Sequence, residues 1–174
     1  MVQLREKDAS SREFYDIAVT LREITRRYNV PFVINDRLDI ALAAGADGLH
    51  IGRSDLPLEA MRRIIGGRLF IGVSAGNVRE ALQAEAEGAD YLGAGPVFPT
   101  GSKTDAGDAI GLEALRAICD AVRIPVVGIG GIDSSNAAAV MQNGAAGIAV
   151  ISAILSQKDI RAAAENLLHS VELA

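Results

Sequence analysis

Two aspartates follow neighbouring predicted strands and could together hold a divalent cation. Asp36 comes directly after the apolar run Phe32–Asn35, and Asp55 lies in the loop after Gly48–Ile51. Carboxylates at adjacent strand ends can bind Mg²⁺, which prefers oxygen ligands and shares its remaining positions with substrate phosphate. Local alternatives stay open for both residues. Asp55 could cap the helix that follows it, and Asp36 could cap the next helix or pair with Arg37.

Three polar residues near the N-terminus alternate along the chain, namely Gln3, Arg5 and Lys7. In an extended strand, alternation points all three side chains the same way. Two cations and an amide on one side suit a bound polyanion, because unpaired buried charge is costly. A frayed N-terminal segment with solvated charges is an equal alternative.

A long loop of unusual composition, GAGPVFPTGSK, occupies residues 93–103. Connections of this length in compact domains are often lids or binding loops. Its glycines would let the strand end approach a ligand, while Thr100, Ser102 and Lys103 would present two hydroxyls and an ammonium. A phosphate-clamping lid accounts for these features together, although a solvated surface loop forbids none of them.

Two further strand ends could cradle a phosphate. Gly130-Gly131 follows one apolar run, and Ile151-Ser152 closes the next. In α/β barrels, loops after the last two strands commonly bind phosphate through backbone N–H groups and a helix N-terminus. Tight strand-to-helix turns are the alternative reading of the same residues.

The elements that must position these residues alternate between short apolar runs and longer amphipathic stretches. Nearly continuous Val, Ile, Leu, Gly and Ala runs are typical of strands buried on both faces of a parallel sheet, so the order predicts βαβ units. The predicted strands are Val2–Arg5, Phe32–Asn35, Gly48–Ile51, Leu69–Val73, Tyr91–Ala94, Val126–Ile129 and Gly147–Ile151. The predicted helices include Ser11–Arg27, Val78–Glu87, Leu112–Val122, Ser134–Gln142 and Asp159–Val171.

A weak internal repeat supports this register. Segments beginning at Gly45, Gly88 and Gly144 each lie between a helix and the next strand. Each glycine is placed as the residue just past a helix, where positive φ is tolerated. Asp47 and Asp90 precede their strands, so we expect them at the structural end of the sheet, as caps or turn residues.

Composition bounds the class of protein. The 174 residues are 49% apolar and 22% charged, with a net charge of −5 and scattered basic residues. These values predict one domain over residues 1–174 and argue against a nucleic-acid face. Cys119 is the only cysteine, which excludes an internal disulfide and fits a reducing compartment. No apolar run approaches the ~20 residues of a membrane span, and the charged start is unlike a signal peptide, so we expect a cytoplasmic protein.

The motifs, taken in order, resemble those of the thiamine-phosphate synthase family along essentially the whole chain. The similar blocks are QLREK at 3–7, INDR at 34–37, GADGLHIG at 45–52, SDLP at 54–57, IGVS at 71–74, GADYLGAGPVFPT at 88–100 and VVGIGGI at 126–132. Several blocks in the right order are more specific than any single motif. The resemblance implies a TIM (β/α)8 barrel that joins hydroxymethylpyrimidine diphosphate to thiazole phosphate, giving thiamine phosphate and diphosphate.

The resemblance also implies roles for single residues. Mg²⁺ would be held by Asp36 and Asp55, and the reaction would be dissociative: diphosphate leaves and the thiazole nitrogen captures the pyrimidine carbocation. The implied thiazole-phosphate site is Gly131, Ile151 and Ser152. The implied diphosphate-binding side chains are Gln3, Arg5, Lys7, Asn35, Ser74, Thr100 and Lys103, with Ser102 standing where the family usually has a second threonine; Arg5, Lys7, Ser74 and Lys103 are the catalytic candidates.

Two other functions are compatible with the same residues. A thiazole tautomerase of the same superfamily would need neither the diphosphate nor the metal, and a non-catalytic barrel could bind a phosphorylated ligand. Seven predicted strands fall one short of a TIM barrel, so we expect the chain to lack the first βα unit, about 30–40 residues, before Gln3. Exposed strand edges would then favour self-association.

Overall fold

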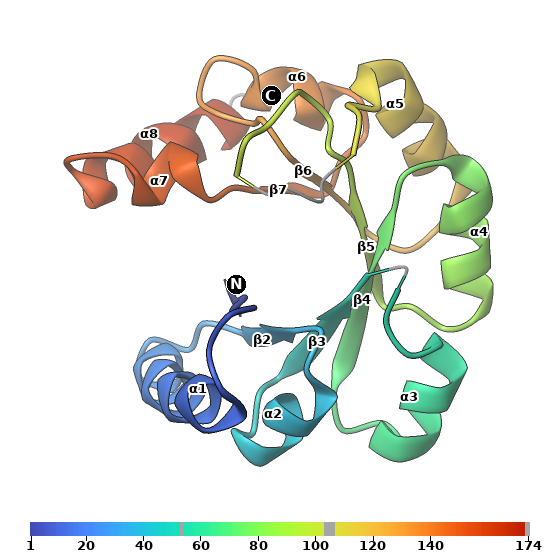
Figure 1. Ribbon diagram of the computed structural model, residues 1–174. Coiled ribbons are helices and arrows are strands. Elements are labelled where there is room, and N and C mark those ends of the chain that lie inside the picture. The colour runs from blue at the N-terminus through green and yellow to red at the C-terminus, as the bar shows by residue number, and fades with distance from the viewer. Residues whose placement is uncertain (53, 103–106, 173–174) are drawn as a thin grey trace. The chain divides into compact units, whose positions relative to one another are not determined.

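Parallel strands and helices alternate along the chain in the computed structural model, which describes residues 1–52, 54–102 and 107–172 (Figure 1). Two compact units can be distinguished. The first unit comprises Met1–Val73 with Glu87–Asp90, and the second comprises Ser74–Ala86 with Tyr91–Ala174.

The first unit is a run of parallel strands with helices between them. Its elements are β1 (Val2–Leu4), α1 (Ser11–Arg27), β2 (Phe32–Asn35), α2 (Leu38–Ala43), β3 (Gly48–Ile51), α3 (Leu58–Ile65) and the first part of β4 (Phe70–Ala75). Gln3 pairs in register with Val33, and Asn35 pairs with His50. Every residue of β2 is buried, as the continuous apolar run predicts for a strand covered on both faces.

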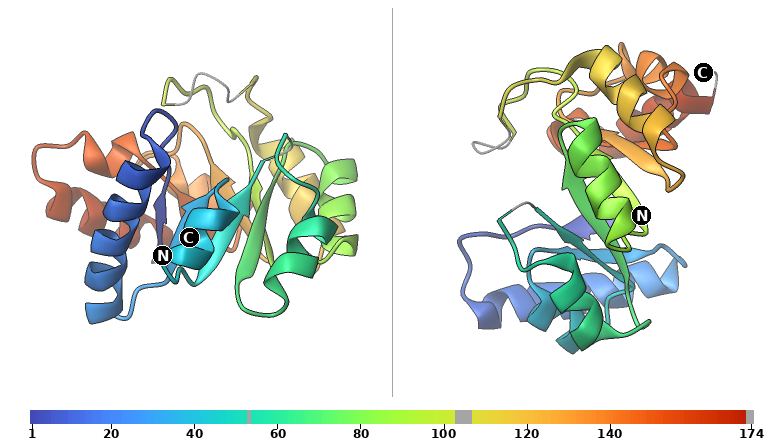
Figure 2. Two further views of the ribbon diagram at one scale, coloured as in Figure 1. Left: turned by 60° about the horizontal axis from the view of Figure 1, so that its bottom comes forward. Right: turned by 90° about the vertical axis from the view of Figure 1, so that its right-hand side faces the viewer.

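The second unit continues the same alternation. Its elements are the end of β4, α4 (Val78–Ala86), β5 (Tyr91–Ala94), α5 (Gly111–Ala121), β6 (Val126–Ile129), α6 (Ala137–Gln142), β7 (Gly147–Ala149), α7 (Ser152–Leu155) and α8 (Ile160–Glu172). Strands β5, β6 and β7 pair in chain order and in parallel. Helices α5 and α6 lie on one side of these strands (Figure 2) and bury Leu115, Ile118 and Val140.

Three predicted element boundaries are wrong in ways that concern the site. Strand β1 ends at Leu4, so Lys7 lies in a bend and not in an extended strand. Strand β4 continues to Ala75, which places Ser74 inside the strand and not after it. Strand β7 ends at Ala149, and Ser152 begins the unpredicted short helix α7.

The repeat at the strand starts has a clear structural role. The glycines at 45, 88 and 144 all have positive φ, as predicted. Asp47 is more than a cap, because it accepts hydrogen bonds from the Arg22 guanidinium at 2.7 and 2.8 Å and from the Phe32 N–H at 2.8 Å. Asp90 likewise joins the guanidinium of Arg62 to a strand N–H. These aspartates tie helices α1 and α3 to the sheet.

No helix in the described part of the chain combines the length and the apolar character that a membrane crossing requires.

Candidate active site

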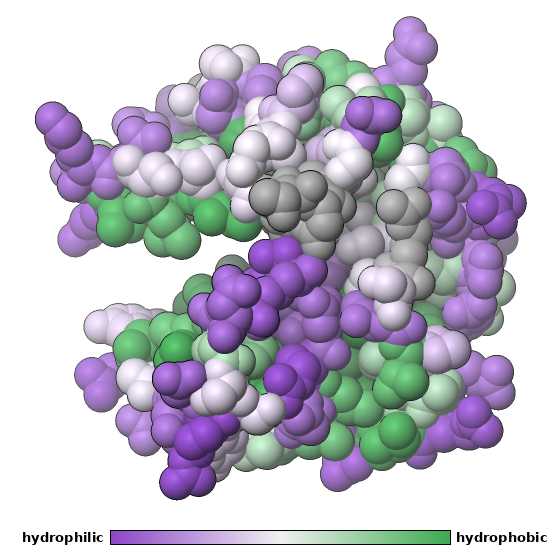
Figure 3. Space-filling view, in the orientation of Figure 1, coloured by the Kyte–Doolittle hydropathy of each residue, from purple (hydrophilic) through white to green (hydrophobic). Residues whose placement is uncertain are grey.

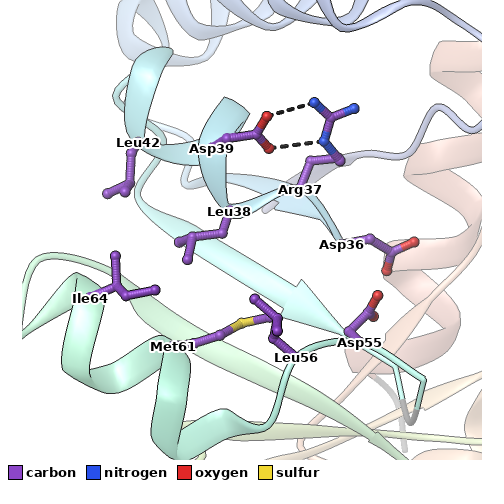
Figure 4. Close-up of a pocket in the computed structure, with 9 residues that line it drawn as sticks. All are labelled: Asp36, Arg37, Leu38, Asp39, Leu42, Asp55, Leu56, Met61 and Ile64. Atoms are coloured by element: carbon purple, nitrogen blue, oxygen red, sulfur yellow. Dashed lines mark hydrogen bonds and ion pairs between the residues drawn. The ribbon is translucent and has the colours of Figure 1, made fainter.

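The two predicted metal ligands lie together in the first unit. Asp36 follows β2 and Asp55 lies between β3 and α3, and Figure 4 shows their carboxylates pointing toward one another. Asp36 adopts a left-handed backbone conformation, with φ at 64°, and its N–H donates to the carbonyl of His50 at 2.8 Å. The Asp55 carboxylate accepts the N–H of Gly52 at 2.6 Å. Two adjacent strand ends therefore bring the two acids face to face.

The electrostatics of this pair favour a cation. Burial raises the pKa of Asp36, and the neighbouring Asp55 carboxylate raises it further, while the charges of Lys7 and Arg5 act in the opposite direction. A carboxylate whose ionised form is disfavoured by burial and a like charge is stabilised when positive charge is added. The same balance shows that both predicted cations lie within electrostatic reach of Asp36.

The alternative predictions, that Asp36 or Asp55 caps the following helix or that Asp36 pairs with Arg37, are wrong. Helix α3 has Pro57 at its N-cap and α2 has Arg37, and neither cap makes a side-chain hydrogen bond. The Arg37 guanidinium pairs with Asp39, not with Asp36. Neither Asp36 nor Asp55 therefore serves as the cap of the helix that follows it.

A pocket opens beside the carboxylates, between α2 and α3 (Figure 4). Acidic side chains lie at one end of it and apolar side chains at the other. It is lined by Asp36, Arg37, Leu38, Asp39, Leu42, Asp55, Leu56, Met61 and Ile64.

Two of the remaining candidates of the first unit, Gln3 and Asn35, lie on one face of the sheet. Gln3 pairs with Val33, two residues before Asn35, so Gln3 and Asn35 point to the same side of the sheet. Asn35 is buried, whereas Gln3 and Lys7 are exposed and Arg5 is half-buried. The prediction that Gln3, Arg5 and Lys7 share one extended strand is wrong beyond Leu4, yet the two cations still reach Asp36.

In the second unit the loop after β5, which we call the lid loop after its predicted role, docks on the end of β6. The N–H of Val97 donates to the carbonyl of Ile129 at 2.8 Å, and that of Phe98 donates to Gly130 at 3.1 Å. A Cβ on Gly95 would lie 2.1 Å from the Ile129 carbonyl oxygen. The close packing of the loop against β6 therefore explains why residue 95 is a glycine. The predicted approach to a ligand is not needed to explain it.

The glycines after β6 are also constrained by this loop. Gly130 and Gly131 have φ of 95° and 63°, and a Cβ on Gly131 would lie 2.6 Å from the Pro99 carbonyl oxygen. The side chain of Asn136 donates to the Gly131 carbonyl at 2.9 Å. These contacts support the tight-turn reading, and the phosphate role of Gly131 stays a prediction.

Three hydroxyl-bearing candidates of the second unit lie in a chain of contacts. The Ser102 N–H donates to Thr100 Oγ1 at 3.2 Å, and the Ser102 and Ser152 hydroxyls are 3.3 Å apart. Ile151 is the N-cap residue of α7, directly before Ser152. Lys103 lies outside the described residues.

Two contacts of Arg37 in the first unit were missed by sequence reasoning. Arg37 was considered only as a partner of Asp36, but it holds Asp39 and the hydroxyl of Ser11. The Arg37-x-Asp39 spacing at a helix start is a signal for the first contact, whereas nothing local points to Ser11.

Comparison with known proteins identifies the family. The family model described as thiamine monophosphate synthase matches residues 1–154. Thiamine-phosphate synthase of Ruminiclostridium cellulolyticum is 56% identical over 168 residues, covering 97% of this chain and 80% of the relative. Thiamine-phosphate synthase of Moorella thermoacetica is 54% identical over 173 residues, covering 99% and 82%.

Solved structures agree with the sequence relatives. Thiamine phosphate pyrophosphorylase from Pyrococcus furiosus superposes with a TM-score of 0.92 at 50% identity, over 98% of this chain and 82% of that one. A 3-hexulose-6-phosphate synthase at 20% identity, with a TM-score of 0.69, shares the fold alone. The predicted α/β fold of the TIM-barrel type is confirmed. Because the family model covers residues 1–154, the curated relatives are more than 50% identical and the fold agrees, the chain belongs to the thiamine monophosphate synthase family and is an enzyme of that type.

Proposed function

We propose that the chain joins hydroxymethylpyrimidine diphosphate to thiazole phosphate with the help of Mg²⁺ bound between Asp36 and Asp55. The transferase activity follows from the family, and the observation that supports the metal is the facing pair of carboxylates. The tautomerase alternative requires neither carboxylate, so the pair favours the synthase reaction.

The residues present fit Mg²⁺. Two carboxylates supply hard oxygen ligands and leave coordination positions for water and for substrate phosphate. In the described ranges no group of three or more His, Cys, Asp or Glu side chains could hold a metal ion. When bound, Mg²⁺ would supply positive charge against the leaving diphosphate.

The cationic side chains have a direct task in this proposal. Arg5 and Lys7, whose charges reach Asp36, bind the diphosphate and neutralise the charge that grows on it as the bond to the pyrimidine breaks. Gln3 and Asn35, on the same sheet face, orient the substrate by hydrogen bonds. Bond cleavage moves the electron pair to the diphosphate oxygen, and the thiazole nitrogen donates the pair that forms the new carbon–nitrogen bond.

The second unit supplies the remaining predicted binding groups. Ser74, Thr100 and Lys103 belong to the proposed diphosphate set. The hydroxyls of Ser102 and Ser152 are 3.3 Å apart, and Ser152 directly follows Ile151. Gly131, Ile151 and Ser152 form the proposed thiazole-phosphate set. The substrates are small molecules.

The test is turnover of both substrates with Mg²⁺, with and without EDTA. We expect Asp36→Asn and Asp55→Asn each to lower turnover by at least ~10²-fold, as for loss of one electrostatic group. Thiazole phosphate binding, measured by calorimetry, should survive in both. Asp120→Asn is the matched control, because it removes an exposed carboxylate on α5 that pairs with Arg116. Wild-type turnover in both site variants, or turnover untouched by EDTA, would exclude the metal role.

A further inference from the structure

Arg37, the residue after Asp36, connects two elements of the first unit. Its guanidinium donates to the Asp39 carboxylate at 2.9 and 2.6 Å and to the hydroxyl of Ser11 at 2.9 Å. Figure 4 shows this guanidinium turned toward Asp39 and away from Asp36. Since Ser11 is the first residue of α1, Arg37 joins the carboxylate turn after β2 to the start of α1.

The segment between β1 and α1 is folded on itself. The Glu6 carboxylate accepts the N–H groups of Asp8 and Ala9 at 2.9 and 3.4 Å. Ser10 and Glu13 form a reciprocal capping box at the start of α1. We call residues 5–10 the cation loop, because it carries Arg5 and Lys7. One end of the cation loop is fixed by the pairing of β1 with β2, and the other end is fixed at the residue that Arg37 holds.

The position of the cation loop affects the charge balance at Asp36. The charges of Lys7 and Arg5 act on Asp36, where they oppose the effects of burial and of Asp55. Coulomb interactions depend on the distance between the charges, so a shift of the loop would alter the charge balance at the carboxylate pair. A bond between the cation loop and the carboxylate turn would hold that balance constant.

We infer that Arg37 is a positioning residue, which fixes the cation loop relative to Asp36 and Asp55 through Ser11. The consequence for substrate binding rests on the proposed function. Asp39 holds the guanidinium plane by accepting from Nε and Nη2, and Nη2 also donates to the Ser11 hydroxyl. A lysine has one compact charge and cannot reproduce this planar fork, so it should not replace Arg37.

The first measurement needs no substrate. Amide exchange by NMR should show Asp8 and Ala9 exchanging about three- to tenfold faster in Arg37→Met and in Ser11→Ala, the range expected for loss of one charge-assisted hydrogen bond at an exposed position. The double variant should be no faster than Arg37→Met, because the two substitutions remove the same contact. Arg116→Met, which breaks an exposed pair on α5, should leave these amides unchanged. Unchanged exchange in Arg37→Met, or faster exchange spread over the whole first unit, would overturn the inference.

The second measurement is calorimetric binding of inorganic diphosphate with Mg²⁺. Arg37→Met and Arg37→Lys should weaken binding about three- to tenfold, whereas Asp36→Asn should remove it. Loss of binding in Asp36→Asn together with wild-type binding in Arg37→Met would retain the proposed function and refute the positioning role. Faster loop exchange in Arg37→Met together with unimpaired binding in Asp36→Asn would retain the positioning role and refute the metal site.

Discussion

At the scale of single residues, Asp36 combines an unusual backbone with a chemical role. Its φ of 64° lies in the left-handed region, which asparagine and aspartate visit more readily than other side chains. Strain of this kind is often retained at functional sites because the surrounding structure enforces it. Here the Arg37 N–H donates to the carbonyl of Asn35 at 2.7 Å and closes a tight turn across Asp36, whose own N–H donates to the carbonyl of His50. The Asp36 carboxylate faces Asp55 from this turn.

The backbone of Asp36 makes the choice of substitution important. Asp36→Ala should lower the free energy of unfolding by ~1 kcal/mol relative to Asp36→Asn, since alanine pays the left-handed cost more fully. Both variants lack the carboxylate, so loss of charge cancels in the comparison. Urea denaturation of the two variants, with Asp120→Ala and Asp120→Asn as a pair in an ordinary helix, provides the measurement. Equal stability of the two Asp36 variants would mean that the turn relaxes.

Within the lid loop, we expect the largest effect on turnover from Lys103, which lies outside the described residues. Lys103→Ala should lower kcat by roughly 10²–10³-fold and raise KM much less, because the leaving diphosphate carries most charge in the transition state. Steady-state kinetics with varied pyrimidine diphosphate separate the two effects. A change in KM alone would make Lys103 a binding group that serves ground state and transition state equally.

At the scale of elements, the sequence predicts what depends on local pattern. The bounds of α1, β2, β3, β5 and β6 agree with the structure because each has a clear period or a continuous apolar run. Helix α7 has four residues, too few to show a period. Lys7 was placed in a strand because alternation continues past Leu4, but Glu6 gathers the next N–H groups and ends the extension.

The candidate site also has features that the sequence predicts and features that it does not. The meeting of Asp36 and Asp55 was predictable, because parallel strand ends converge at one edge of a sheet. The partners of Arg37 and the need for glycine at Gly95 were not, since both depend on which distant atoms come close in the folded chain. Strand order can be inferred from a sequence, whereas individual side-chain contacts require coordinates.

The docking of the lid loop on β6 can be tested with two glycines of the same loop. Gly95→Ala places a Cβ 2.1 Å from the Ile129 carbonyl oxygen, whereas Gly101→Ala meets nothing within 4 Å. Gly95→Ala should therefore lower the free energy of unfolding by about 1–3 kcal/mol, the usual cost of overpacking, and Gly101→Ala by less than about 0.5 kcal/mol. Chemical denaturation followed by circular dichroism measures both. Equal stabilities would show that the loop does not require this close approach.

Strand β5 supplies a prediction for alkaline pH. Burial raises the pKa of Tyr91 to about 12 from its ordinary value of 10.0. Between these values the unfolded chain releases the phenol proton before the folded chain does, so the stability contributed by the neutral phenol is present below pH 10 and is lost as pH approaches 12. The melting temperature of the wild type should fall in this window more than that of Tyr91→Phe. Parallel curves for the two proteins would contradict the assignment.

At the scale of the whole molecule, helix α1 and its C-cap residue leave three large apolar side chains exposed. Its buried residues include Phe14 and Ala18, yet Ile17, Ile24 and Tyr28 remain 42%, 46% and 70% exposed. Spacings of seven and four residues place these three on one flank, beside the buried face. Among the described strands, the neighbouring β1 pairs only with β2. Apolar surface around α1, and along α7 in the second unit, is visible in Figure 3.

An apolar helix flank next to an open strand edge favours association with another chain. We therefore expect the protein to self-associate with rising concentration. The double variant Ile17→Gln/Ile24→Gln should weaken this association by roughly 30-fold, since each of the two removed apolar contacts contributes about 1 kcal/mol. Glutamine leaves the net charge at −5, so general repulsion does not change. Leu82→Gln/Leu168→Gln is the matched control, because it removes two exposed apolar side chains from other helices, α4 and α8. Sedimentation equilibrium over a range of loading concentrations provides the measurement. A wild type that stays monomeric throughout, or an equal response of both double variants, would show that the flank of α1 is not the associating surface.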